Sequence, residues 1–444
     1  MSLLEVCKLA EKIAVRAGAD DVEAYASIDK EVEVFIERND IKLGKVHTKS
    51  ILGVRVFKNK SAGFTATNNL SAESVKDVSI RAVKMAKTAP AEKFNILPDK
   101  SKPRLLQGIY EKGAENFTVK EALERALLML ETAKDYDKRI TVDSGTFNTA
   151  VSQNAIVNSN GIEVSEKISM FSWAIMGMAI KGNDISNFDY QTGGTHQVRN
   201  INVEKTAKDF AENVVGSLGA KRVESFKGFV VLSPEAVADV IVAPVESSAN
   251  ANLVQKGMSK FASKLAKEVA SKDLTIIDDG TFVDGLAASS FDREGVPHKR
   301  LKIIENGVLR SYMYNTYTAA KDHVKSTGHA IGGGRTSPSV GPTNIIIEQG
   351  KEELNSIIKG IRKGILVTRF SGNVSSVSGD FSGVIKGGFL IQNGQKKHAI
   401  KETLMAGNVY TSLNNIHAIS KERKLMGAML LPYVCVHNIS ITAG

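Results

Sequence analysis

The stretch Glu31–Glu37, with the sequence EVEVFIE, decides the fold class of this chain. Apolar side chains at positions 32, 34 and 36 recur at every second residue, with acidic residues among them. A period of two is that of a β-strand with one buried face. Asn39-Asp40 is a turn signal, and Ile41–Thr48 follows it as a second strand. We therefore expect antiparallel sheet in the first half of the chain.

Helices and further strands flank this hairpin. Before it, the apolar residues of Leu3–Ala14 recur at helical spacing, and Gly18 ends that helix. After it, Ser71 is placed to cap a helix that reaches about Lys87. The other strands that we expect here are Val22–Ala26, Gly53–Phe57 and Gly63–Thr67.

A proline-rich connector from Pro90 to Pro103 leads to a second segment. Thr118 and Glu121 have the spacing of a capping box, and their helix runs to about Asp135. The strands expected next are Ile140–Phe147, Ala150–Val157, Ile162–Ile180 and Ser186–Gln191, followed by a helix over Val203–Leu218. We place the domain boundary between Ser217 and Lys227. This gives an N-terminal α+β domain of residues 1–220, with sub-segments of about 1–90 and 104–220, and a C-terminal domain of residues 221–444.

The C-terminal half opens with a strand at Gly228–Leu232. Ser233-Pro234-Glu235 then combines an N-cap, a proline at the first helical position and an early acid. We expect a second long helix from about Asn250 to Val269. The strands predicted after it are Thr275–Ile277, His298–Glu305, Val308–Met313, Asn344–Glu348, Gly364–Thr368, Gly383–Asn393, Ala399–Glu402 and Tyr433–Ile441. The fold class is thus α+β, with a largely antiparallel second half led by two helices.

Composition narrows the classes of function. The 444 residues are 42% apolar and 24% charged, which is typical of globular protein and not of a disordered chain. The net charge of +10 comes from lysines scattered along helices without interleaved aromatic residues, so we do not expect direct nucleic-acid binding. Two cysteines, Cys7 and Cys435, fit a reducing cytoplasm, and both lie in apolar patterns typical of a core. We expect neither a signal peptide nor a membrane span.

No catalytic or metal-binding motif stands out. None of the eight histidines belongs to a His-Glu-x-x-His pair, although a metal site assembled from distant histidines stays open. A Gly-x-Ser-x-Gly nucleophile elbow is absent. The stretch Gly332–Thr336 (GGGRT) lacks the Gly-Lys-Ser/Thr ending of a phosphate loop, so nucleotide binding is a weak alternative.

Two loops carry the candidate substrate contacts. Ser290–Pro297 (SFDREGVP) places two acids and an arginine in a turn, and Ser326–Ala330 (STGHA) leads into the glycines. An ion-paired turn and a flexible loop are the structural alternatives, which we weigh evenly with a substrate-facing role, since functional residues gather on loops held by rigid strands. The substrate-binding candidates are Asp292, Glu294, Thr327, His329 and Arg335.

These two loops, together with Leu274–Gly285 (LTIIDDGTFVDG), Gly379–Asn393 (GDFSGVIKGGFLIQN) and Met405–Asn408 (MAGN), resemble the TldD/PmbA peptidase family. Ile51–Asn69 in the first half is similar to that family's first domain. The resemblance covers nearly the whole chain and implies two branches. TldD-type subunits carry His-Glu-x-x-x-His and a downstream Cys, which hold zinc. PmbA-type subunits, also called TldE, lack this motif and pair with a TldD-type subunit.

The resemblance places the metal motif within or beside Ser233–Ser247 and the downstream Cys at Met426. Ser233–Ser247 contains no histidine. We therefore expect a PmbA/TldE-like subunit of a cytoplasmic peptidase complex that acts on peptides or small unfolded proteins. In this interpretation the chain has no catalytic residue, no metal ligand and no cofactor of its own. Zinc belongs to a TldD-type partner in a heterodimer or higher oligomer, and peptides are the substrates.

Two other functions remain. The chain could act alone as a hydrolase through an unrecognised site, for which Asp292, Glu294 and His329 are the candidates. Alternatively it could be a binding protein that modulates DNA gyrase, a role suggested by its basic charge and by the family's older name.

Overall fold

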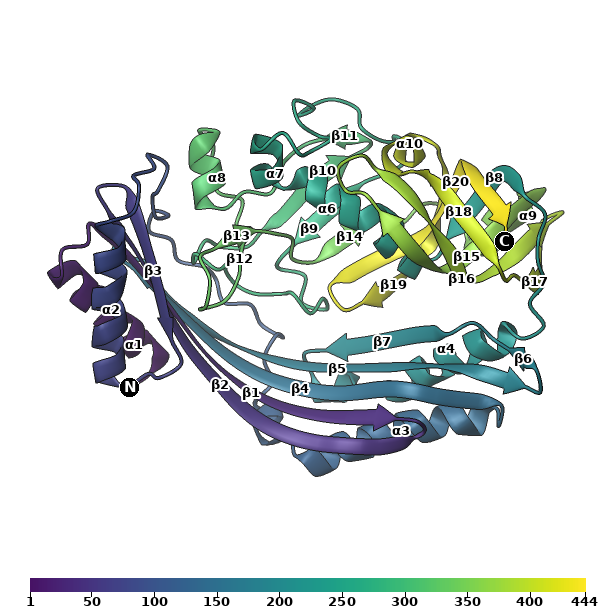
Figure 1. The fold of residues 1–444 in the computed structure, drawn as a ribbon, viewed down its shortest axis with the longest axis horizontal. Helices are drawn as coiled ribbons and strands as arrows, with labels where there is room; N and C mark the ends of the chain where they lie inside the picture. Colours follow the sequence, from purple (N-terminus) through teal and green to yellow (C-terminus); the bar gives the residue numbers. More distant parts are fainter.

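The computed structural model describes residues 1–444 and builds two large sheets, one from each half of the chain (Figure 1). The first sheet has seven strands in the order β3-β2-β1-β4-β5-β6, with β7 paired to β5. Its pairings are antiparallel throughout. The strands are β1 (Asp21–Glu37), β2 (Asp40–Lys58), β3 (Ser61–Thr67), β4 (Ile140–Asn158), β5 (Glu163–Lys181), β6 (Asp184–Ile185) and β7 (Asp189–Thr195).

One face of this sheet is covered by four helices: α1 (Leu3–Arg16), α2 (Ala72–Ala86), α3 (Val119–Tyr136) and α4 (Val203–Gly216). The short 3-10 turns η1 (Lys112–Asn116) and η2 (Val198–Asn200) precede the last two. The alternation of β1 explains the arrangement, because its even-numbered apolar residues enter the helix-covered cores. Its odd-numbered residues therefore face the second half of the chain, below which the sheet curves in Figure 1.

The second sheet has eleven strands, five of which form a closed barrel. The barrel closes because β20 pairs with β18 on one side and with β8 on the other, which leaves no free edge in that ring. The strands are β8 (Phe226–Leu232), β9 (Ile276–Asp279), β10 (Arg300–Glu305), β11 (Val308–Leu309), β14 (Ile345–Ile347), β15 (Lys363–Val374), β16 (Asp380–Gln392), β17 (Gln395–Ala399), β18 (Thr403–Asn408), β19 (Ile416–Met426) and β20 (Met429–Ala443). A separate pair consists of β12 (Ala330–Ile331) and β13 (Ser339–Val340).

A helical segment that begins at Ser233 packs against the barrel strands β8, β15 and β20. It consists of α5 (Pro234–Val237), the π-helical turn η3 (Ala238–Val242) and α6 (Ala243–Ala249). The other helices of this half are α7 (Ala251–Gln255), α8 (Thr316–Lys321), α9 (Leu354–Lys359) and α10 (Val409–Asn414). Apolar side chains of this helical segment lie in the largest core cluster, which has 42 buried residues and also includes side chains of the barrel strands and of β9, β10 and β14. No helix of the structure is long and apolar enough to cross a membrane.

The α+β prediction is confirmed, as are the capping box at Thr118 and the cap at Ser71. The predicted helix Asn250–Val269 is wrong, because only Ala251–Gln255 is helical. Gly257 ends it with a φ of +71°, and positive φ values at Ser263 and Ala266 prevent its resumption. The strand pairs predicted on either side of residues 27–30, 49–52 and 148–149 are single continuous strands, β1, β2 and β4.

Candidate functional site

A proline widens the helical segment that lines the cleft between the two halves. Ser233 caps its start, and its hydroxyl also donates to the carbonyl of Thr368 at 3.0 Å. Pro244 lies inside the segment, has no N–H to donate, and would crowd the carbonyl four residues before it. The backbone adjusts by a π turn, in which the N–H of Ala243 donates to the carbonyl of Ala238. That turn carries Asp239 on its exposed side.

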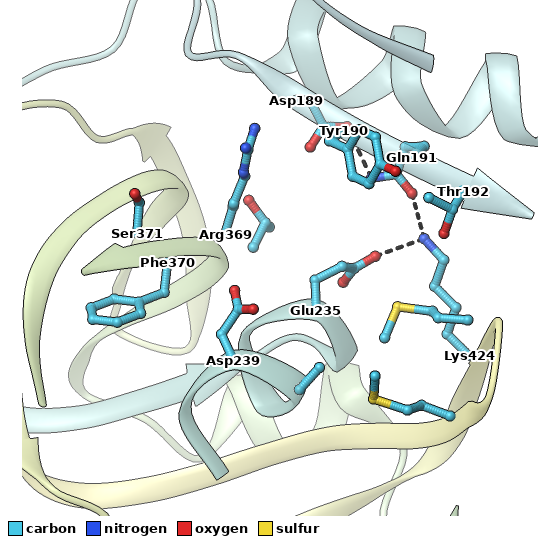
Figure 2. A pocket seen from close by; sticks show the side chains of 14 residues that line it. Asp189, Tyr190, Gln191, Thr192, Glu235, Asp239, Arg369, Phe370, Ser371 and Lys424 are labelled. Carbon is cyan, nitrogen blue, oxygen red and sulfur yellow. Dashed lines mark hydrogen bonds and ion pairs between the residues drawn. The ribbon is translucent and has the colours of Figure 1, made fainter. Parts of the chain in front are cut away.

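A cavity of about 400 Å³ lies beside this π turn, between the two halves of the chain (Figure 2). One wall is β7 of the first sheet, which contributes Asp189, Tyr190, Gln191 and Thr192. The helical segment, β15, β19 and β20 form the opposite wall. The cavity exists because two independently built sheets meet there, and concave sites at such junctions are the usual place for ligands.

In one acid–base pair of the cavity, Glu235 and Lys424, the two side chains are in direct contact. Lys424 Nζ lies 2.7 Å from Glu235 Oε1 and also donates to Gln191 Oε1 at 2.5 Å, so it joins the two walls. Figure 2 shows the ammonium between these two side chains. Asp189 is also satisfied, because it accepts hydrogen bonds from Gln191 at 2.9 Å and Asn213 at 3.0 Å. Its burial raises the pKa of its carboxyl.

The side chains of a second acid–base pair, Asp239 and Arg369, do not contact each other. The side chain of Asp239 reaches solvent through the cavity, but the surrounding walls remove part of its hydration and raise the pKa of its carboxyl to about 6. Arg369 follows a β-bulge in β15, which redirects its side chain, and its Nη1 donates to the carbonyl of Phe188 at 3.0 Å. The guanidinium lowers the pKa of Asp239 without an ion-pair contact between them.

The residues that line this cavity do not fit a zinc ion. Zinc prefers imidazole and thiolate, and no His or Cys lies among the fourteen lining residues. Met426, at the position that the resemblance gives to a zinc-binding Cys, offers a neutral thioether. Glu235 is already bound to the Lys424 ammonium, whose positive charge would repel a cation.

A different group of side chains has atoms at metal-binding distance. Glu31, Glu33 and His47 place their ligand atoms within 4.8 Å of one another on the strand pair β1–β2. Both carboxylates already have cationic partners, because Lys49 contacts Glu31 and Lys45 contacts Glu33, each at 2.8 Å. This group is therefore an internally neutralised surface cluster, apart from the cavity.

The loop Ser290–Pro297 is placed at the junction of the two halves. Glu294 accepts from Arg55 at 2.9 Å and from the Thr316 N–H at 2.8 Å. Arg293 contacts Glu23 at 2.9 Å, and Glu23 also contacts Arg55 at 2.5 Å. These four charged side chains, Glu23, Arg55, Arg293 and Glu294, form a buried ionic network between the sheet and the C-terminal half.

The predicted substrate-binding residues fall into two environments. Asp292 accepts three backbone N–H groups, lines a second cavity of about 280 Å³, and has its pKa raised to about 8 by burial and by Glu294. His329 is buried with its Nε2 3.1 Å from Asp278 Oδ1 and its Nδ1 2.9 Å from Thr327 Oγ1. Arg335 is exposed. The structure thus brings Asp292, Glu294, Thr327 and His329 into the interior and leaves Arg335 at the surface.

Of the charged residues in this cavity, the sequence singled out Glu235, as an early helical acid, but not Asp239, Asp189, Arg369 or Lys424. The cap and proline at Ser233-Pro234 signalled the helix that carries the first two. No local signal marks the others, because Gln191 and Lys424 meet across 233 residues of sequence.

Comparisons with known proteins agree over nearly the whole chain. Models of the PmbA/TldA metallopeptidase family match in three parts: domain 1 over residues 22–86, the central domain over 112–218 and the C-terminal domain over 226–443. A metalloprotease PmbA from Escherichia coli O157:H7 is 24% identical, covering 93% of this chain and 91% of its own. A metalloprotease TldD homologue from Buchnera aphidicola is 26% identical, with 88% and 83% covered.

Two solved structures share the fold. TldE from Thermococcus kodakarensis superposes with a TM-score of 0.91 at 22% identity and covers 100% of both chains. A Thermotoga maritima protein, named for modulation of a DNA gyrase, has a TM-score of 0.89 at 23% identity and covers 99% of this chain and 100% of its own. With three domain models matched in order along most of its length, the chain belongs to the PmbA/TldA metallopeptidase family.

Proposed function

We propose that this chain is a PmbA/TldE-like subunit of a cytoplasmic zinc-dependent peptidase complex that cleaves peptides or small unfolded proteins. In this proposal the chain holds no zinc. A TldD-type partner carries the metal, in a heterodimer or a higher oligomer, and this chain shapes the cleft in which the peptide lies.

The observation that carries the proposal is the donor set of the 400 Å³ cavity. A metallopeptidase family member would be expected to present imidazole or thiolate to the cleft, whereas this cavity presents carboxylates, an amide, a lysine and thioethers. A fixed ammonium beside Glu235 supports a role other than metal binding. The residues therefore favour binding and shaping over hydrolysis by this chain alone.

Strand β7 offers a way to hold an extended peptide. It pairs only with β5 and forms one wall of the cavity, so backbone groups along its other edge have no strand partner. A peptide added there would bind through main-chain hydrogen bonds with little sequence preference. In this proposal the exposed Arg335 and the second cavity beside Asp292 are further points of contact with the peptide.

The decisive experiment compares the purified chain alone with the chain purified together with a TldD-type partner. Bound zinc is measured by elemental analysis and cleavage by mass spectrometry of an unstructured peptide. We expect about one zinc per complex and cleavage only with the partner. Stoichiometric zinc together with strong cleavage by the lone chain would overturn the proposal.

The autonomous hydrolase is the less favoured alternative, because Glu294 and His329 are buried with protein partners. This alternative would be favoured again if alanine substitutions of Asp292, Glu294 and His329 abolished the activity of the lone, folded chain. A gyrase-binding role requires salt-dependent association with gyrase or DNA in the absence of a peptidase partner.

A further inference from the structure

The carboxylate of Asp239 lines the cavity of about 400 Å³ and has no partner within the protein. The pKa of its carboxyl is raised by burial and by the charge of Glu235, and it is lowered by the charge of Arg369. No hydrogen bond contributes to this shift. The π turn fixes its backbone at a rare geometry that often marks functional sites. An acid held in this way, open to the cavity, is free to accept donors from a ligand.

Arg369 is the matching base. Of its five N–H donors, one is used, by Nη1 to the Phe188 carbonyl. That bond anchors the guanidinium at the cavity wall, and Figure 2 shows the side chain extending along the cavity, with the guanidinium at the end away from Asp239. A planar guanidinium with free donors is suited to bind a carboxylate through two parallel hydrogen bonds.

The neighbouring pair, Glu235 and Lys424, differs from Asp239 and Arg369 because its two charges are already in contact. Glu235 and Lys424 are in direct contact at 2.7 Å, so their charges cancel inside the protein. Asp239 and Arg369 make no such contact, so one negative and one positive group remain for a ligand. A simple cation would be repelled by Arg369 and a simple anion by Asp239, whereas a zwitterion complements both.

We propose that this cavity binds the two charged ends of a short peptide, with the α-ammonium at Asp239 and the α-carboxylate at Arg369. The volume of about 400 Å³ is at the lower end of small-molecule sites and suits two or three residues. Met426 and Met429 line the wall between the helical segment and β20, and their flexible thioethers accommodate different apolar side chains. That the ligand is a peptide rests on the proposed function, in which cleavage by the complex releases such fragments.

The test uses calorimetric titration of the full chain with the dipeptide alanyl-leucine and its two blocked forms. N-acetylation removes the ammonium, and C-terminal amidation removes the carboxylate. We expect each blocked form to bind roughly tenfold or more weakly, because each loses a charge-assisted contact. Equal affinity of the three forms, or no binding of the free dipeptide at millimolar concentration, would overturn the inference.

Variants of Asp239 and Arg369 test which residue binds which charged end of the dipeptide. Asp239→Asn should abolish the preference for the free ammonium and keep the preference for the free carboxylate, whereas Arg369→Gln should do the opposite. Asp239→Ser serves as a second variant, and circular dichroism checks that each is folded. Glu246→Gln, on the same helical segment, and Arg362→Gln, just before β15, are matched controls outside the cavity lining and should leave both preferences unchanged. Preferences that survive in the Asp239 and Arg369 variants contradict the assignment.

Peptide cleavage by the complex with a TldD-type partner is measured separately. Cleavage without dipeptide binding by this chain would refute only the inference about the cavity. Dipeptide binding without cleavage by the complex would refute only the proposed function.

Discussion

Replacing Arg55 by methionine tests whether the buried ionic network holds the two halves of the chain together. Arg55 is 7% exposed and contacts Glu23 at 2.5 Å and Glu294 at 2.9 Å. In the variant, Glu23 keeps Arg293, but Glu294, which is fully buried, keeps only the Thr316 N–H. An uncompensated buried charge of this kind costs about 3–5 kcal/mol of unfolding free energy.

The loss is measurable by two probes. The single tryptophan, Trp173, lies in the core beneath the first sheet, so its fluorescence reports unfolding of that half, while circular dichroism reports the whole chain. At roughly 2–4 °C per kcal/mol for a unit of about 200 residues, the melting temperature should fall by about 6–20 °C. Adding Glu294→Gln to Arg55→Met should recover about 1–3 kcal/mol, because the orphaned charge is then removed.

A control on the same strand is Lys58→Met, which breaks an exposed contact to Asp20 at 2.7 Å. Exposed pairs contribute about 0–1 kcal/mol, so this variant should melt close to the wild type. An Arg55→Met protein as stable as the control, or a double variant no more stable than the single one, would refute the reasoning.

Three further predictions concern packing, pH and thiol reactivity. Gly53→Ala should lower the unfolding free energy by about 1–3 kcal/mol, because the new Cβ would lie 2.4 Å from the backbone carbonyl oxygen of Gly334 in the opposing glycine-rich loop. Denaturant titration measures this loss, and an unchanged midpoint argues against that contact. Burial raises the pKa of Glu246 from 4.5 to about 7, so its folded state keeps a proton that the unfolded state loses, and stability should fall as pH rises from about 4.5 through 7. Glu246→Gln should remove this part of the pH dependence, and identical pH profiles of the two proteins would contradict it. Burial raises the pKa of Cys7 and of Cys435 to about 12, so iodoacetamide should label neither thiol in the native protein and both in urea, as read by mass spectrometry; fast native labelling would show that the thiols are accessible.

The sequence predicts elements well where the decisive interactions are local. The alternation of EVEVFIE and the caps at Ser71 and Thr118 gave the right element types, because period and capping depend on residues within one turn of each other. The helix expected over Asn250–Val269 failed for a tertiary reason. Phe261 is buried in the largest core cluster and the Val269 N–H donates to the Gly307 carbonyl, so the backbone follows contacts from distant residues.

The site was predictable only in part for the same reason. The loop Ser290–Pro297 was recognised as unusual, yet its charged side chains meet Glu23 and Arg55, which lie more than 230 residues away. Asp239 could be placed on a helix from Ser233-Pro234, but Arg369 enters the same cavity from β15, beside a bulge that no local pattern announces. Cavities between domains depend on such long-range meetings, which a single sequence does not encode in any one stretch.

The ionic network also fixes an order of events during synthesis. Glu294 is synthesised 239 residues after Arg55, so at roughly 5–20 residues per second the Glu23–Arg55 pair waits about 12–48 s for its partners. During that interval Glu23 and Arg55 neutralise each other across neighbouring strands, which keeps the nascent half free of a buried lone charge. Arg293 and Glu294 then arrive side by side, one for each member of the waiting pair. A chain terminated before residue 293 lacks both partners of that pair as well as β15, β19 and β20, and therefore has no cleft.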